Sequence, residues 1–142
     1  MKIVLIIVVV IVVLGLLFYL FPVIQVCGNS MSPTYTDGEY IWGRRLYRKS
    51  KLKKGDVIIY TCPHDGQTVI KRIGEIIRLN SGQFKGSDIE NKLVFYCYGD
   101  NPSQSFDSRN YGGVLQNYLI CKAITQRTKV ERIDEYEESN TL

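Results

Sequence analysis

Histidine, alanine and tryptophan are almost absent from this chain of 142 residues, which contains one of each. The single histidine, His64, stands in Pro63-His64-Asp65-Gly66, a combination typical of an exposed turn. The cysteines and this histidine form no CxxC or Cys/His spacing of the kind that binds a metal ion. We therefore expect no metal site, and the turn disfavours chemistry that depends on His64.

Charge is absent from Ile3 to Ile24. About 20 apolar residues in a helix cross the ~30 Å hydrocarbon core of a bilayer. The alternative is a cleaved signal peptide, whose apolar region is usually only about 7–15 residues long and precedes a small-x-small site. Such a site is missing, because Ala123 is the only alanine, and the bulky Val26 before Cys27 does not suit lipoprotein processing. We predict an uncleaved membrane anchor over residues 1–25.

The net charge of +4 is mild and unevenly distributed. Arg44 to Lys54 carries seven basic residues and no acidic one, whereas Glu131 to Glu138 carries five acidic residues and one arginine. No nucleic-acid motif accompanies the basic run, so we interpret it as a solvated loop near the membrane and expect no nucleic-acid partner. Lys2 is the only charge before the apolar run, whereas the basic run follows it, so the positive-inside rule alone would place the domain in the cytoplasm. However, that rule weakens for long domains. Charge alone does not settle the orientation.

The four cysteines, Cys27, Cys62, Cys97 and Cys121, permit three complete disulfide pairings. The sequence does not choose among these pairings. We expect free, buried thiols instead.

Turn residues divide the rest of the chain into short segments rich in β-branched and aromatic residues. Strands are expected over residues 39–42, 56–60, 68–77, 92–98 and 114–125. This pattern predicts a mainly β fold, either a sandwich or a folded-over sheet, in a domain of residues 26–129. The acidic tail of residues 130–142, with a weak helical pattern around residues 130–136, is expected to be solvated.

Ser30 and Lys71 are the candidates for chemistry. A serine hydroxyl needs a neighbouring base to become a nucleophile. In an alternating strand, Val69, Lys71 and Ile73 share one face, so the amine of Lys71 would lose hydration and its pKa would fall. A neutral lysine can accept the proton of a serine. The alternative, which spacing alone favours, is a lysine that extends its amine to solvent from a half-exposed strand.

Four segments, taken together, resemble the conserved boxes of type I signal peptidases, the Ser/Lys endopeptidases that remove leader peptides from exported proteins. They occur in the order of that family, behind an apolar run, and the resemblance covers about residues 26–115. The segments are Gly28-x-Ser30-Met31-x-Pro33-Thr34, Gly55-Asp56-Val57-Ile58-Ile59-Tyr60, Val69-Ile70-Lys71-Arg72-Ile73, and Gly99-Asp100-Asn101 followed by Ser105-Phe106-Asp107-Ser108-Arg109.

The resemblance implies a role for each matching residue. Ser30 would be the nucleophile and Lys71 the general base. The Ser105 hydroxyl would lie beside the lysine and orient it, and Asp107 and Arg109 would form a supporting ion pair. Without the other boxes, residues 105–109 would be read as an ordinary polar turn.

The resemblance also bears on four further residues. Arg72 would be structural, and Met31 and Pro33 would contact the substrate. Met31 and Trp42 could each dip into the membrane near the active site or belong to the core, and the sequence leaves both alternatives open.

The chain departs from the family pattern at two positions. Some members have a serine two residues before the nucleophile that donates to the oxyanion, but Gly28 stands there. The oxyanion hole would then consist of the Ser30 backbone N–H and a further donor or a water. Gly74-Glu75-Ile76-Ile77 replaces a Gly-x-Pro-Gly-Asp stretch, and the short interval from Lys71 to Gly99 leaves little room for the large inserted second domain of some relatives.

The resemblance therefore implies a single-pass protein of the plasma membrane with its β-rich domain on the extracytoplasmic side. It would cleave signal peptides of preproteins close to the bilayer and to the export machinery, without a cofactor. Two alternatives stay open: a specialised maturation protease of the same family, and a catalytically silent membrane protein that binds leader peptides.

Overall fold

The computed structural model describes residues 1–79 and 92–127. The predicted acidic tail and the weak helical pattern within it lie outside these residues. The elements are α1 (Lys2–Leu20), β1 (Val23–Gln25), β2 (Tyr40–Arg44), η1 (Lys49–Lys51), β3 (Val57–Thr61), β4 (Thr68–Arg78), β5 (Leu93–Tyr98), η2 (Pro102–Gln104), α2 (Ser108–Tyr111), β6 (Val114–Leu115), η3 (Gln116–Tyr118) and β7 (Leu119–Ala123).

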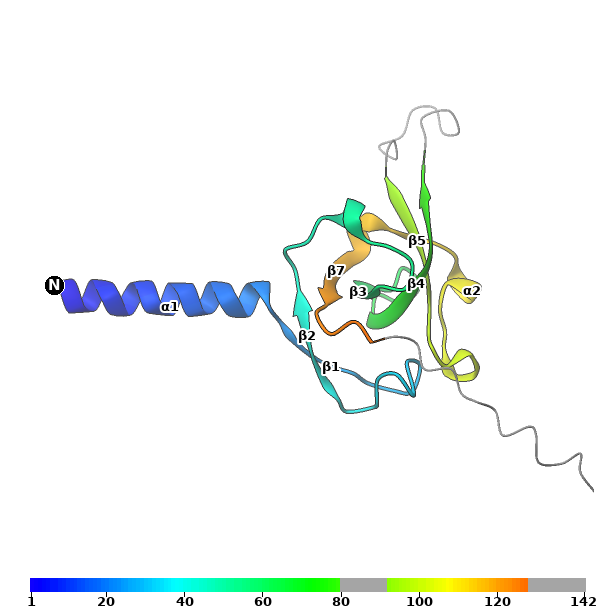
Figure 1. Cartoon of the computed structure of the whole chain (residues 1–142), viewed down its shortest axis with the longest axis horizontal. Helices are drawn as coiled ribbons and strands as arrows, with labels where there is room; N and C mark the ends of the chain where they lie inside the picture. Colours follow the sequence, from blue (N-terminus) through cyan, green and yellow to red (C-terminus); the bar gives the residue numbers. More distant parts are fainter. Residues whose placement is uncertain (80–91, 128–142) are drawn as a thin grey trace, which may run out of the picture.

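Helix α1 projects from one side of the β-rich domain, and none of its residues is buried (Figure 1). Its 19 residues have a mean hydropathy of 3.5 over the best window, and at about 1.5 Å per residue they match the thickness of a bilayer core. Backbone bonds hold the end of the helix beside the β2 segment. Arg45 N–H, directly after β2, donates to Leu20 O at 2.9 Å, and Gly43 N–H of β2 donates to Pro22 O, two residues after the helix, at 2.8 Å. An N-terminal apolar helix able to span a membrane, followed by a mainly β domain, confirms the predicted fold class.

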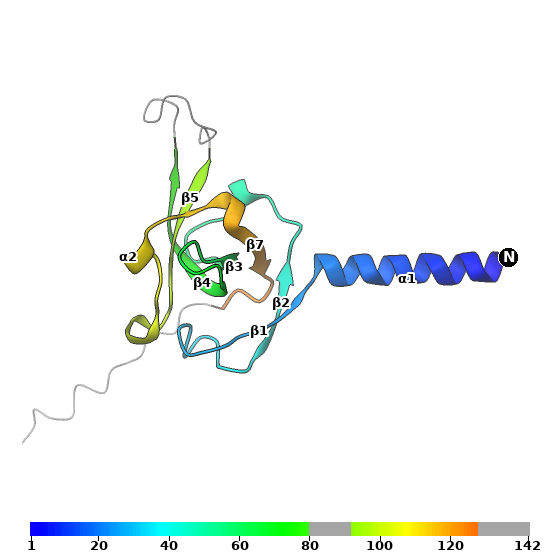
Figure 2. The same cartoon turned by 180° about the vertical axis from the view of Figure 1, so that it is seen from behind.

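The seven strands form one antiparallel sheet in the order β1-β2-β7-β3-β4-β5-β6, and it curls around the domain (Figures 1 and 2). β3 is central and is buried on both faces. Val57 and Ile59 belong to one core cluster, while Ile58 and Tyr60 belong to a second cluster on the other face. This alternation follows from the side-chain period of two in a strand.

The predicted strands correspond to observed ones, with two differences. The segment of residues 114–125 is divided into β6 and β7 by the 3-10 turn η3. β1 was not predicted; it lies within the residues assigned to the anchor and pairs with β2, Val23 opposite Trp42.

Gly55 lies in the predicted turn, two residues before β3, and has a positive φ of 93°, a conformation that glycine adopts without steric cost. At residues 74–77, where the sequence departs from the family pattern, β4 continues to Arg78 and pairs directly with β5. Its register shifts between Ile73 and Glu75, where a Cβ on Gly74 would lie 2.3 Å from the Tyr98 ring.

All four cysteines are free, as expected. Cys62, Cys97 and Cys121 are buried, whereas Cys27 is exposed, which differs from the expectation of buried thiols. Burial raises the pKa of Cys97 to about 12 and that of Cys121 to about 11, so both thiols stay protonated near neutral pH.

Candidate active site

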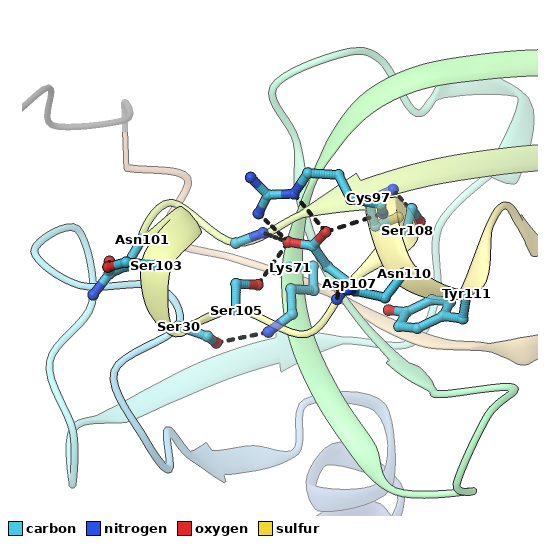
Figure 3. A network of polar contacts seen from close by, with 12 residues as sticks. Ser30, Lys71, Cys97, Asn101, Ser103, Ser105, Asp107, Ser108, Asn110 and Tyr111 are labelled. Atoms are coloured by element: carbon cyan, nitrogen blue, oxygen red, sulfur yellow. Dashed lines mark hydrogen bonds and ion pairs between the residues drawn. The ribbon is translucent and has the colours of Figure 1, made fainter.

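Ser30 and Lys71 meet although 41 positions separate them in the chain. Ser30 lies in the loop after β1, and Lys71 projects from β4. The Nζ atom of Lys71 is 2.6 Å from the Oγ atom of Ser30, as the dashed line in Figure 3 shows. This is hydrogen-bond distance, so a proton can pass directly between hydroxyl and amine.

Lys71 is buried, with 4% of its surface exposed. Ile58, which is fully buried, lies opposite it on β3, and Val69 and Ile73 of β4 belong to the same core cluster as Ile58. Burial lowers the pKa of Lys71 below its ordinary value, while the negative charge of Asp107 acts in the opposite direction. The apolar face predicted from strand alternation therefore exists, and it favours the neutral amine.

The nucleophile loop is fixed to the segment after β5 through its backbone. Asn101 N–H donates to Ser30 O at 3.0 Å. A Cβ placed on Gly99 would lie 2.5 Å from Ser30 O and 2.2 Å from Ser105 Oγ, so only glycine permits this approach. The contact holds Ser30 against the elements that carry Ser105 and Asp107.

The Ser30 N–H, which the sequence proposes as an oxyanion donor, has no acceptor among the described residues. By contrast, Gly28 N–H donates to Asp37 Oδ1 at 2.7 Å. The amide of Gly28 is thus engaged, and the Ser30 amide is the free donor next to the hydroxyl.

Asp107 is the centre of the polar network in Figure 3 and is fully buried. Its carboxylate accepts hydrogen bonds from Ser105 Oγ at 2.6 Å, Gly99 N–H at 2.9 Å, and Arg109 Nε at 2.8 Å. The Nη2 atom of Arg109 makes a second contact with the carboxylate, at 2.5 Å. Burial alone would raise the pKa of Asp107, but these donors hold it well below the usual range, so the carboxylate stays ionised.

Ser105 therefore has a different partner from the one the resemblance implies. Its hydroxyl donates to Asp107, and within residues 1–79 and 92–127 no hydrogen bond joins it to Lys71. Asp107 and Arg109 form the expected ion pair. The network brings Ser105 up to the Ser30 loop, while the amine of Lys71 is directed to Ser30.

Arg72, expected to be structural, binds three separate segments. Its guanidinium contacts both carboxylate oxygens of Asp100, at 2.8 and 2.6 Å. It also donates to Gly55 O and Arg127 O, each at 2.8 Å. Arg72 thus joins β4 to the segment that carries Gly99 and Asn101, from the face opposite to Lys71.

The remaining sequence candidates lie as follows. Met31 is fully buried in the first core cluster, which excludes membrane contact by its side chain, whereas Trp42 is 50% exposed. Pro33 is exposed. His64 is exposed, as predicted, and its ring lies 5.2 Å from that of Phe106.

Sequence reasoning assigned no role to Gly99, Asp100 or Asn101, although they stand in a segment it singled out. The backbone bond from Asn101 to Ser30 carries no sequence signal, because any residue except proline can donate it. The Gly-Asp-Asn triplet was identified only as part of the fourth segment that resembles the family, without a role for its individual residues.

The family model described as signal peptidase, peptidase S26, matches residues 1–77, a range that includes Ser30 and Lys71. The mitochondrial inner membrane protease subunit 1 of Schizosaccharomyces pombe is 34% identical over 117 residues, covering 76% of this chain and 74% of that protein.

Proposed function

Because this chain belongs to the signal peptidase family, peptidase S26, we propose that it is a membrane-anchored serine endopeptidase that removes N-terminal signal peptides through Ser30 and Lys71. The observation that carries the proposal is the 2.6 Å separation of Ser30 Oγ from a lysine amine that is buried and has a lowered pKa.

In the reaction, Ser30 Oγ attacks the carbonyl carbon of the scissile peptide bond and transfers its proton to the neutral Nζ of Lys71. The tetrahedral intermediate then breaks its C–N bond, and Lys71 returns the proton to the leaving amine. An ester on Ser30 remains. A water molecule, deprotonated by the same lysine, attacks that ester and releases the second product, which restores the serine.

The negative charge on the intermediate requires donors placed in advance. The Ser30 N–H has no acceptor among the described residues and is adjacent to the attacking oxygen, which supports its use here. A single oxyanion donor typically contributes about 3–4 kcal/mol to transition-state stabilisation.

The test uses the full chain, solubilised in detergent, and a model preprotein whose two products are separated by gel and mass. Ser30→Ala, Lys71→Ala and Lys71→Arg should each lower the rate by roughly 10⁴-fold or more, arginine because it stays protonated. His64→Ala is the matched control and should retain most activity. Loss of turnover in His64→Ala with retention in Lys71→Ala would overturn the assignment.

For location, we propose a single-pass protein of the plasma membrane whose catalytic domain faces the extracytoplasmic side. Ten positions separate the end of α1 from Ser30, which an extended chain covers in at most ~35 Å. The substrates would reach this domain from the bilayer after export. Protease added to intact spheroplasts should digest the domain, whereas protection until lysis would show that it is cytoplasmic.

One observation favours a specialised role within the same chemistry. The fission-yeast relative is, by its name, a subunit of a protease of the mitochondrial inner membrane. A panel of unrelated preproteins distinguishes the two functions, because a general signal peptidase cleaves most of them and a specialised maturation protease cleaves one or few. A catalytically silent leader-binding protein would bind the panel and cleave none.

A further inference from the structure

A basic cavity and an apolar groove adjoin each other where helix α1 meets the sheet. The cavity has a volume of about 700 Å³, and its lining includes Arg44, Tyr47, Arg48, Lys51, Lys122 and Ile124. The groove has a volume of about 380 Å³, and its lining includes Leu14, Leu17, Phe18, Phe21, Trp42 and Ile124. Ile124 belongs to both, so the two form one continuous surface.

The cavity carries positive charge without a matching anion. Lys122 is paired with Asp56 at 2.7 Å. Arg44, Arg48 and Lys51 are exposed, and none of the three forms an ion pair with a described residue. The run from Arg44 to Lys54 also contains no acidic residue. An anion entering this cavity meets three uncompensated cations.

The groove is formed by the last turns of the apolar helix together with the domain. Trp42 and Ile124 are 50% and 48% exposed, and they adjoin the apolar residues of α1 in this groove, so together they form a contiguous apolar surface. The guanidinium of Arg45 lies 4.7 Å from the Tyr19 ring and fixes the start of the basic segment to the helix end. Figures 1 and 2 both show the segment between β2 and η1 on the side of the domain from which α1 leaves.

We propose that this surface binds an anionic phospholipid of the bilayer that α1 enters, with the headgroup phosphate in the basic cavity and an acyl chain in the groove. A soluble anion would use the cavity alone, and a neutral lipid would use the groove alone; an anionic phospholipid matches both. The lipid site contains neither Ser30 nor Lys71, so lipid binding can be tested independently of the peptidase reaction.

Trp42 is the only tryptophan, which makes its fluorescence a direct reporter of lipid in the groove. The full chain is placed in phosphatidylcholine nanodiscs that contain increasing fractions of brominated phosphatidylglycerol, and, in parallel, of brominated phosphatidylcholine. Bromine on an acyl chain quenches the tryptophan on contact. The brominated phosphatidylglycerol should reach half-maximal quenching at a several-fold lower mole fraction.

Two double variants identify the site. Arg48→Gln/Lys51→Gln removes two charges from the cavity, and each such charge near an anionic surface changes binding by about fivefold. The preference for phosphatidylglycerol should therefore disappear. Lys53→Gln/Lys54→Gln removes two exposed charges from the same run that do not line the cavity, and it should keep the preference.

Two results would overturn the proposal. Equal quenching by the two brominated lipids in the unmodified chain would show that the cavity selects no headgroup. Equal loss of the preference in both double variants would show diffuse attraction of a basic loop to an anionic surface instead of a defined site.

Discussion

The guanidinium of Arg109 covers the fully buried carboxylate of Asp107 with contacts of 2.8 and 2.5 Å. Asp107 raises the pKa of Lys71, and Arg109 lowers it. The ion pair therefore holds Ser105 and Gly99 in place while limiting the negative charge that the lysine amine experiences.

Arg109→Gln should move the acid limb of the kcat/KM profile towards alkaline pH. Without the guanidinium, Asp107 is left uncompensated and raises the pKa of Lys71, so less neutral amine is present at pH 7. The variant should also lose roughly 1–2 kcal/mol of stability, a discounted value because the Arg109 side chain is 42% exposed. A profile that superimposes on that of the unmodified enzyme would show that Arg109 has no electrostatic effect on the lysine.

Ile73→Thr should shift the same limb through a different cause, the hydration of the amine. Ile73 is buried in the cluster that faces Lys71, and a hydroxyl there would bring water or a polar partner to the site. The pKa of Lys71 should rise, with activity at high pH less affected. An unchanged acid limb in a folded Ile73→Thr variant would mean that this face does not control the lysine.

Lys71→Met should abolish cleavage and raise the free energy of unfolding, by about 1–2 kcal/mol at neutral pH. The folded pKa of Lys71 lies below the unfolded value near 10.5. The lysine therefore destabilises the fold fully below its folded pKa, and this effect disappears as pH rises towards 10.5. Denaturant unfolding at several pH values should show the difference between the two proteins shrinking as pH rises. A constant difference would indicate that Lys71 titrates normally.

Gly99→Ala should lower kcat/KM by about 100-fold, the effect expected when a reacting group is displaced by roughly 1 Å. The added Cβ would collide with Ser30 O and Ser105 Oγ. Gly15→Ala is the control, because a Cβ there meets nothing within 4 Å, and it should be silent. Full activity in Gly99→Ala would show that the loop tolerates movement and that this contact does not position Ser30.

The strands that sequence reasoning found are those with local signals at both ends. β3 follows the Lys54-Gly55 turn and is followed by the break at Cys62 to Gly66. Before β1 the only break is Pro22, and Val23 and Ile24 then continue the apolar run of the anchor, so no separate segment marks a strand there. Only its pairing with β2, a tertiary contact, makes it a strand.

In the candidate site, too, features that depend on tertiary contacts could not be predicted from the sequence. The hydroxyl of Ser30 and the amine of Lys71 could be identified from residue type and from the resemblance. The apolar face around Lys71 could be predicted from strand alternation. The hydrogen bond of Ser105 to Asp107 instead of Lys71 depends on side-chain rotamers, which the sequence does not determine. The support of Ser30 by the Asn101 amide depends on how two distant loops pack.

The central claim is that Ser30 is acylated with Lys71 as its base, and mass spectrometry of the acyl-enzyme tests it most directly. The full chain in detergent is mixed with a peptide ester of the signal-peptide type, quenched in acid and digested. The account predicts an acyl adduct on Ser30 that forms in the unmodified chain and in His64→Ala, and that is absent from folded Lys71→Met. An adduct on Ser105 or another serine, or acylation of Lys71→Met at the unmodified rate, would contradict it.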